Sequence, residues 1–131
     1  MARVREALTQ FVAAADLDAA RVDSYLRRID YVAVDVTADA GWSALAGRLA
    51  ETAERVRVFY LATAPNLFGP ICQRLAGSGV LTPKTRVVLE KPLGHDLASN
   101  RAINTAVSKV LQEWQIFRID QYLGKHSVQN L

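Results

Sequence analysis

The sequence contains little cysteine, no long apolar run and no cluster of like charges. Cys72 is the single cysteine of 131 residues, so no disulfide can form within the chain, and a reducing, cytoplasmic setting is expected. No apolar run approaches the roughly 20 residues that span a bilayer. The basic residues are scattered, which argues against a nucleic-acid-binding segment. We therefore expect neither a membrane nor a nucleic acid as a partner.

Glycine-rich turns are also missing. None of the seven glycines forms a Gly-x-Gly-x-x-Gly pattern, and the close pair Gly77 and Gly79 follows a helical stretch and not a strand. Such a turn normally follows the first strand of a parallel nucleotide-binding sheet and cradles phosphate. The two histidines, His95 and His126, lack the spacing to other ligands that a metal site requires, so no metal is expected.

The composition that remains is that of one globular domain. Half of the residues are hydrophobic and 22% are charged, and the formal net charge is +3. A mildly basic protein of this kind can offer an active-site face that attracts phosphorylated metabolites.

Strand and helix patterns alternate along the chain. Strands are predicted at residues 31–36, 56–62, 85–90 and 115–120. Six helices are predicted, at residues 3–12, up to 28, 40–52, 66 to about 76, up to about 113, and from Gln121 or Tyr122 onward. Three of them have candidate N-terminal caps: Asp16 or Asp18 for the helix that reaches residue 28, Thr37 or Asp39 for 40–52, and Asp96 or Ser99 for the helix that reaches about 113. The alternation predicts an α/β fold with a parallel sheet and right-handed crossovers. Because the first helix has no visible cap and the last no stop, residues 1–131 are expected to be part of a longer domain.

Two segments carry polar groups at predicted strand ends. Glu90-Lys91-Pro92 ends one strand, and strand carboxyl ends face the ligand crevice in open α/β sheets. Lys91 can donate to a substrate hydroxyl there, or it can be an ordinary solvated lysine. Asp120 ends the next strand, and Gln121, Tyr122 and Lys125 follow within the first turn of a helix, where a phosphate is favoured. The plainer alternative is an aspartate cap beside an exposed lysine.

The octapeptide from Arg118 to Lys125 resembles the signature of the glucose-6-phosphate dehydrogenases, R-I-D-H-Y-L-G-K. The resemblance extends, in matching order and spacing, to the following segments: 4–8, 31–36, 59–65, 91–94 and 128–131. It implies an incomplete Rossmann-type domain over residues 1–131 that lacks the first strands, the glycine-rich turn and the second, catalytic domain. It also implies a homo-oligomeric parent enzyme that oxidises glucose 6-phosphate to the lactone and reduces NADP.

The resemblance further implies roles for individual residues. Lys91, followed by a cis proline, would contact substrate and cofactor, and Asp120 would orient a catalytic histidine of the second domain. Gln121, Tyr122 and Lys125 would bind the sugar phosphate. Five residues would line the cofactor: Val34, Asp35, Thr63, Ala64 and Pro65.

The chain departs from the family at position 121, where Gln121 replaces a histidine and cannot become cationic. Since the base and the phosphate turn are absent, we expect the isolated chain to be inactive. Two alternatives stay open: a non-catalytic fragment or pseudo-enzyme that acts as a binding module, and another sugar dehydrogenase that shares Glu-Lys-Pro.

Overall fold

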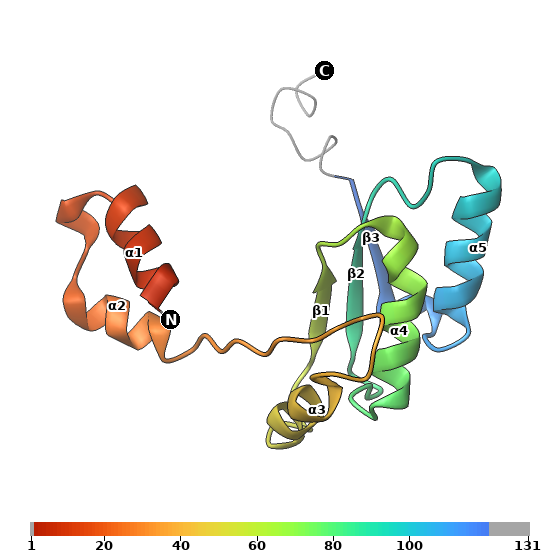
Figure 1. Ribbon diagram of the computed structural model, residues 1–131, viewed down its shortest axis with the longest axis horizontal. Helices are drawn as coiled ribbons and strands as arrows, with labels where there is room; N and C mark the ends of the chain where they lie inside the picture. The colour runs from red at the N-terminus through yellow and green to blue at the C-terminus, as the bar shows by residue number, and fades with distance from the viewer. Residues whose placement is uncertain (1, 121–131) are drawn as a thin grey trace. The chain divides into compact units, whose positions relative to one another are not determined.

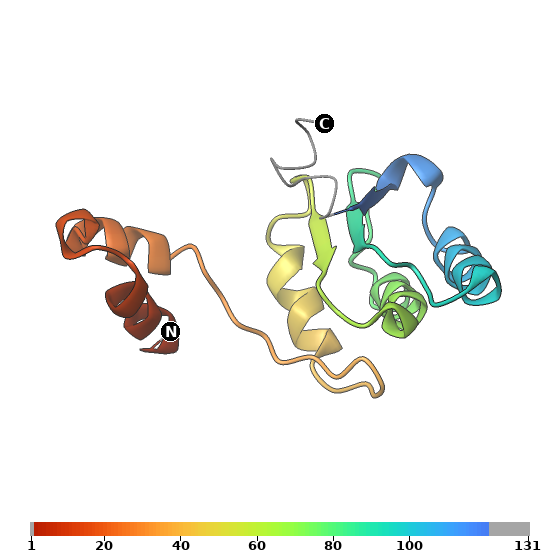
Figure 2. The same cartoon turned by 90° about the horizontal axis from the view of Figure 1, so that it is seen from above.

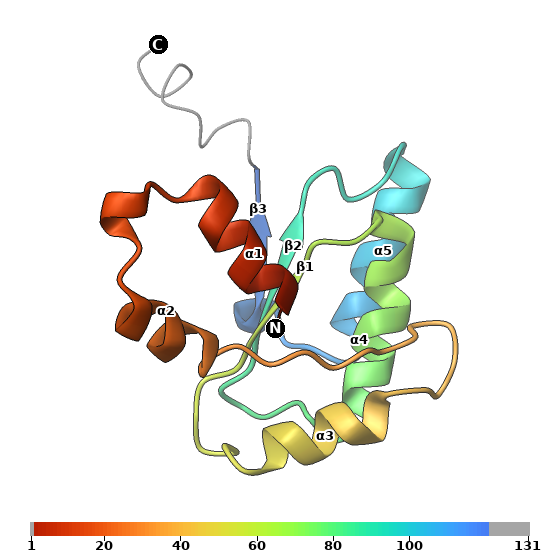
Figure 3. The same ribbon diagram turned by 60° about the vertical axis from the view of Figure 1, so that its left-hand side comes forward.

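The computed structural model describes residues 2–120, and the chain divides into two compact units, Met1–Ala33 and Val34–Leu131. The first unit contains two helices and a short 3-10 turn: α1 (Ala2–Phe11), η1 (Ala14–Asp16) and α2 (Ala19–Leu26). Figure 3 shows α1 and α2 lying against one another, and Arg5 Nη2 lies 2.5 Å from Asp23 Oδ1 between them. Asp18 caps α2 by accepting a hydrogen bond from Arg21 N at 2.8 Å, so of the two predicted caps Asp18 is correct.

The second unit is built on a three-stranded parallel sheet in the order β1-β2-β3 (Figure 1). Its elements follow in this order: α3 (Trp42–Ala50), β1 (Val58–Leu61), η2 (Pro65–Leu67), α4 (Phe68–Gly77), β2 (Arg86–Glu90), α5 (Leu97–Ser108), η3 (Glu113–Gln115) and β3 (Ile116–Ile119). Helices join consecutive parallel strands, which confirms the predicted α/β class with a partial Rossmann-type sheet.

Helices α3, α4 and α5 lie on the same side of the sheet, as the view in Figure 2 shows. Phe68 of α4, Val87 of β2 and Val107 of α5 are fully buried between the two layers. Side chains alternate between the two faces along a strand, so Val87 and Leu89 enter this core while Val88 points away. One face of the sheet therefore packs against the helices to form the core.

The opposite face of the sheet carries apolar side chains that are open to solvent. Val58 and Tyr60 of β1 are 60% and 50% exposed, and Phe117 of β3 is 47% exposed. Tyr60 pairs with Val88 across the β1–β2 ladder, and Val88 pairs with Phe117 across the β2–β3 ladder. One continuous apolar row thus crosses the face that α3, α4 and α5 leave uncovered.

The predicted strand at residues 31–36 is wrong. This segment has no regular secondary structure, although burial alternates along it as it would in a strand. A strand needs a neighbour to which its backbone groups bond. The strand ladders of the described residues involve β1, β2 and β3 alone, and Asp35 N instead bonds to Ala40 O at 3.0 Å in a turn.

Several element ends also differ from the sequence prediction. The cap of α3 is Gly41, with φ of 86°, and neither Thr37 nor Asp39. Strand β1 begins two residues later than predicted, and α5 ends at Ser108 instead of near residue 113, because the η3 turn follows. The predicted cap by Asp96 or Ser99 is confirmed with both residues at once, since they form a capping box. The helix predicted near Gln121 lies outside the described residues.

Candidate functional site

The carboxyl end of β2 turns sharply at Lys91. Its backbone N donates to Ile119 O at 3.0 Å, so pairing with β3 continues one residue beyond the strand. The Lys91–Pro92 bond that follows is cis, as the family resemblance led us to expect. The chain then enters α5, where the Asp96 carboxylate accepts from Ser99 N at 2.7 Å and the Ser99 hydroxyl accepts from Asp96 N at 3.1 Å. Both ends of this turn are therefore fixed by hydrogen bonds.

Lys91 and Asp120 meet at the ends of neighbouring strands. The distance from Lys91 Nζ to Asp120 Oδ2 is 3.8 Å, and the two side chains are 49% and 32% exposed. An ion pair this long and this exposed contributes little to stability, about 0–1 kcal/mol. The two groups are thus held near each other by the sheet and can exchange partners at small cost.

The turn Thr63-Ala64-Pro65 leaves the sheet at the same edge, directly after β1. Thr63 and Ala64 are exposed, and Pro65 opens the η2 turn that leads into α4. Because parallel strands end at one edge, this turn, Lys91 and Asp120 share the side of the sheet where open α/β proteins bind ligands.

Val34 and Asp35 are placed differently. Val34 is half-buried against the core of the second unit. The Asp35 carboxylate accepts from Thr37 Oγ1 at 2.7 Å and from Thr37 N at 2.8 Å, and these bonds hold the pKa of Asp35 below its usual value. The Asp35 carbonyl accepts from the indole of Trp42 at 2.8 Å. Asp35 therefore closes the turn before α3, and its contact with a cofactor stays a prediction. The predicted phosphate-binding residues Gln121, Tyr122 and Lys125 lie outside the described residues.

The edge also contains contacts that the sequence alone does not predict. The Tyr60 hydroxyl of β1 donates to Glu90 Oε1 at the end of β2. Arg118 of β3 donates to Asn104 Oδ1 of α5 at 2.9 Å and to Glu113 Oε1 at 2.6 Å, which ties the strand before Asp120 to the helical layer. Strand alternation already places Tyr60 on the open face, but the sequence does not show that its ring reaches across to the next strand.

A hollow of about 900 Å³ lies between α3, α4 and the turn at residues 36–39. Its floor includes Trp42 and Leu67, and Arg74 and Asp39 form an ion pair at its rim. Within residues 2–120, no three His, Cys, Asp or Glu side chains are grouped so that they could hold a metal ion. None of the described helices is long and apolar enough to cross a membrane.

Comparison with known proteins decides the family. Residues 1–130 match the model of the glucose-6-phosphate dehydrogenase NAD binding domain. The chain belongs to this family. It is 49% identical over 132 residues to the glucose-6-phosphate 1-dehydrogenase of Mycolicibacterium smegmatis, and 46% identical over 133 residues to that of Gluconobacter oxydans.

Solved structures of the family agree with this assignment. The glucose-6-phosphate 1-dehydrogenase of Mycobacterium avium matches with a TM-score of 0.72 and 34% identity, over 98% of this chain and 30% of that one. A glucose-6-phosphate dehydrogenase in complex with its substrate glucose-6-phosphate matches with a TM-score of 0.75 and 32% identity, over 98% and 28%. The alignments with the Mycolicibacterium and Gluconobacter relatives cover 98% and 100% of this chain but 27% of each relative. The chain thus spans about a quarter of the length of these family members.

Proposed function

We propose that this chain supplies the nicotinamide-facing part of a glucose-6-phosphate dehydrogenase, which oxidises glucose 6-phosphate to 6-phosphogluconolactone and reduces NADP. The observation that supports this most directly is the approach of Lys91 Nζ to Asp120 Oδ2, 3.8 Å apart at the carboxyl ends of two neighbouring parallel strands. A cation and a carboxylate at that edge offer a donor and an acceptor to a hydroxylated substrate.

The residues present fit one half of the cofactor. Lys91 and the exposed Thr63 offer donors and Asp120 an acceptor, which suits the hydroxyl and amide groups of a nicotinamide riboside. No turn of this sequence has the glycine pattern that cradles a pyrophosphate. When bound, NADP supplies the hydride acceptor.

The side chains have separate tasks in this proposal. Lys91 donates a hydrogen bond to a sugar hydroxyl beside the reacting carbon, and its weak pairing with Asp120 lets it turn to the substrate. Asp120 accepts a hydrogen bond from the catalytic histidine that the family carries in its second domain, and so orients it. Gln121, Tyr122 and Lys125 remain the residues predicted to hold the sugar phosphate.

A chimaeric enzyme tests the proposal. The segment of the Mycolicibacterium smegmatis relative that aligns with this chain is replaced by residues 1–131, and NADPH formation from glucose 6-phosphate is followed. We expect turnover by the chimaera and none by the isolated chain. Lys91→Met should lower kcat/KM by about 10²–10³-fold, the scale for loss of one preorganised hydrogen-bond donor beside the reacting centre.

Lys84→Met is the matched control, because Lys84 is an exposed lysine that precedes β2 at the opposite edge of the sheet. It should change kcat/KM by less than about twofold. The proposal fails if the chimaera binds NADP but does not turn over, or if Lys91→Met is as active as the control.

A further inference from the structure

Position 118 of β3 faces the helices, yet it is occupied by an arginine. Arg118 is in register with Leu89, which is 1% exposed in the core, and Ile116, two residues before it on the same face, is also buried. The Arg118 side chain itself is 25% exposed. A charged group at a core-facing position requires partners that bind it, so the contacts of Arg118 indicate what it holds in place.

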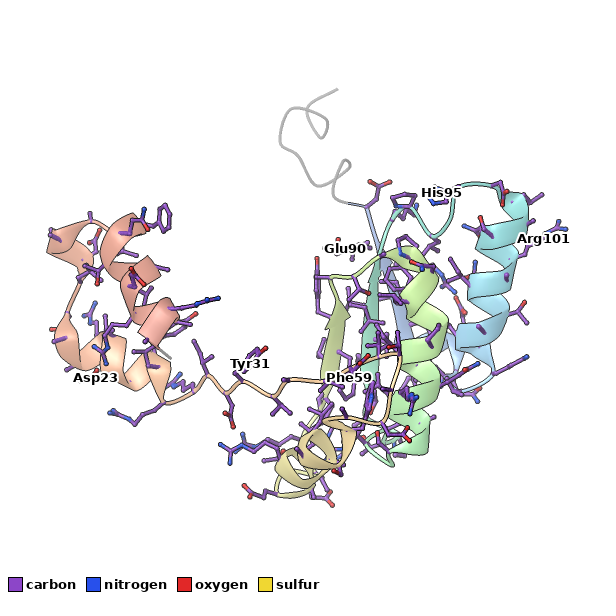
Figure 4. All side chains as sticks on the ribbon, viewed as in Figure 1. Asp23, Tyr31, Phe59, Glu90, His95 and Arg101 are labelled. Carbon is purple, nitrogen blue, oxygen red and sulfur yellow. The ribbon has the colours of Figure 1, made fainter. Side chains whose placement is uncertain are left out.

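Asn104 of α5 is the first partner of this guanidinium. Its Nδ2 donates to Oδ1 of Asn100 at 2.8 Å and to the Asn100 carbonyl at 2.9 Å, which turns the Asn104 Oδ1 towards the sheet. That oxygen accepts from Nη2 of Arg118 at 2.9 Å and from Nε at 3.2 Å. Figure 4 shows Arg101 of the same helix reaching away from the sheet, whereas Asn100 and Asn104 are half-buried. Asn104 therefore links the helical layer to β3 through one side chain.

Glu113, which lies just before β3, is the second partner. Its Oε1 accepts from Nη1 of Arg118 at 2.6 Å and its Oε2 from Nη2 at 3.3 Å, and these contacts hold the pKa of the Glu113 carboxyl below its usual value. The Glu113 side chain is 72% exposed, so solvent weakens this pair. Asn104 accepts on the Nε side of the guanidinium and Glu113 at its end, so the planar group is held in one orientation.

Strand β3 lies at one side of the described sheet, and Asp120 directly follows it. The order β1-β2-β3 gives β3 one neighbouring strand among residues 2–120, and the bond from Lys91 N to Ile119 O at 3.0 Å continues that pairing to the residue before Asp120. Residues two apart in an extended segment share a face, so the Asp120 carboxylate leaves β3 on the Arg118 side, where it lies 3.8 Å from the Lys91 ammonium. A contact that fixes Arg118 therefore also fixes where Asp120 emerges.

We propose that Arg118 and Asn104 are positioning residues: by tying the end of β3 to α5, they hold the Asp120 carboxylate at the place where it meets Lys91. The consequence for turnover rests on the proposed function, in which Asp120 orients the catalytic histidine. The tie itself lies within the described residues and is measurable without substrate or cofactor.

Amide hydrogen exchange of the full chain tests the tie, because each amide reports the opening of its own hydrogen bond. The Lys91 amide reports the end of the β2–β3 pairing, and the Arg86 amide, which donates to Arg57 O at 2.7 Å, reports the start of the β1–β2 pairing. A change that destabilises the second unit as a whole accelerates exchange at both amides, whereas loss of the tie accelerates exchange at Lys91 alone.

Asn104→Leu removes the tie at nearly constant side-chain volume and leaves Arg118 its carboxylate partner. It should accelerate exchange at Lys91 about tenfold, the factor that corresponds to a hydrogen bond to a charged group, and change the rate at Arg86 by less than about twofold. Asn104→Asp keeps an oxygen that accepts from Arg118 and should bring the Lys91 rate back towards that of the parent chain. Thr105→Leu, at the exposed residue that follows on α5, is the matched control and should leave both rates unchanged.

Kinetics of the chimaeric enzyme separate this inference from the proposed function. Asn104→Leu should lower kcat by about 10–100-fold with little change in KM for glucose 6-phosphate, because it displaces a group that orients the base and touches no substrate. The inference is overturned if Asn104→Leu accelerates exchange equally at Lys91 and Arg86, or at neither, or if Asn104→Asp does not restore the Lys91 rate. Faster exchange at Lys91 alone, without a loss of kcat, would confirm the tie but contradict the role of Asp120 in the proposed function. An inactive chimaera would count against the proposed function, and the exchange rates would still decide the inference.

Discussion

Arg57 joins three parts of the chain from a buried position. The residue is 8% exposed, and its two terminal nitrogens donate to Val80 O and to Leu49 O, each at 2.6 Å. Leu49 lies in the last turn of α3, where unpaired carbonyl groups favour a cation. The remaining nitrogen, Nε, has no hydrogen-bond partner among residues 2–120. Arg57 therefore binds the start of β1 to the end of α3 and to the loop after α4.

Replacing Arg57 by methionine should destabilise the second unit. The change keeps most of the apolar stem but removes the Arg57 donor from Val80 O and from Leu49 O, of which Leu49 O still accepts from Thr52 N at 3.1 Å, so we expect a cost of about 1–3 kcal/mol. Urea denaturation followed by circular dichroism measures the difference. Arg55→Met, at an exposed arginine two residues earlier, is the control. A loss below about 1 kcal/mol would show that water satisfies these carbonyl groups equally well.

For individual residues, the sequence predicts only part of the candidate site. The family resemblance implies the cis bond before Pro92, and the positions of Lys91 and Asp120 at two strand ends place them at the same edge of the sheet; the structure contains both features. The contact between Tyr60 and Glu90 depends on the register of two strands, which no local pattern specifies. The contact with the cofactor that the resemblance implies for Asp35 stays a prediction.

Among the elements, α5 has the most complete N-terminus. The pKa of the Asp96 carboxyl lies below its usual value, chiefly because Ser99 N donates to it and also because the Ser99 hydroxyl does. A carboxyl whose pKa is lower in the folded state stabilises the fold above its unfolded pKa of about 3.9, and this contribution disappears as the pH falls through the folded value.

Asp96→Ala should therefore lower the urea midpoint at neutral pH, and the difference from the parent chain should shrink below about pH 4. Midpoints measured across a series of acidic buffers give this profile. Asp16→Ala removes an exposed aspartate of the η1 turn and serves as the comparison. A difference that stays constant with pH would mean that Asp96 acts without its charge.

Elements differ in how well the sequence predicts them. Helices α1 to α5 and all three paired strands overlap the ranges that periodicity predicts, although β1 begins two residues late and α5 ends at Ser108. The strand prediction for residues 31–36 is wrong because alternating β-branched residues favour an extended backbone but do not supply a neighbouring strand to pair with. The predicted side-chain cap of α3 is wrong because the helix begins after Gly41, which adopts a positive φ without strain and offers no side chain to the first turn.

For the chain as a whole, one face of the sheet in the second unit is left without helices among the described residues. Val58, Tyr60 and Phe117 expose about half or more of their area there, and helices α3, α4 and α5 cover the other face. Exposed apolar rows of this kind drive association in water. We expect the isolated chain to self-associate at micromolar concentration.

Val58→Lys should weaken this association. Burial of a valine side chain is worth about 1.5 kcal/mol, so its replacement should raise the dissociation constant about tenfold. Sedimentation velocity over a concentration series measures the shift. Thr105→Lys introduces the same charge on the exposed surface of α5 and should have no such effect. Equal weakening by both variants would assign the association to net charge instead of to the sheet face.

The parallel order of the strands also has a consequence for how the chain is made. Each strand pairs with one that a whole helix separates from it in sequence, so neither ladder can form until the intervening helix has been synthesised. Strand β3, and Asp120 after it, leave the ribosome last among the elements described. Lys91 is exposed to the cell well before its partner exists, and the β1–β2 layer must stay folded on α4 during that interval. The pairing of Lys91 with Asp120 is thus completed last among the described parts of the sheet.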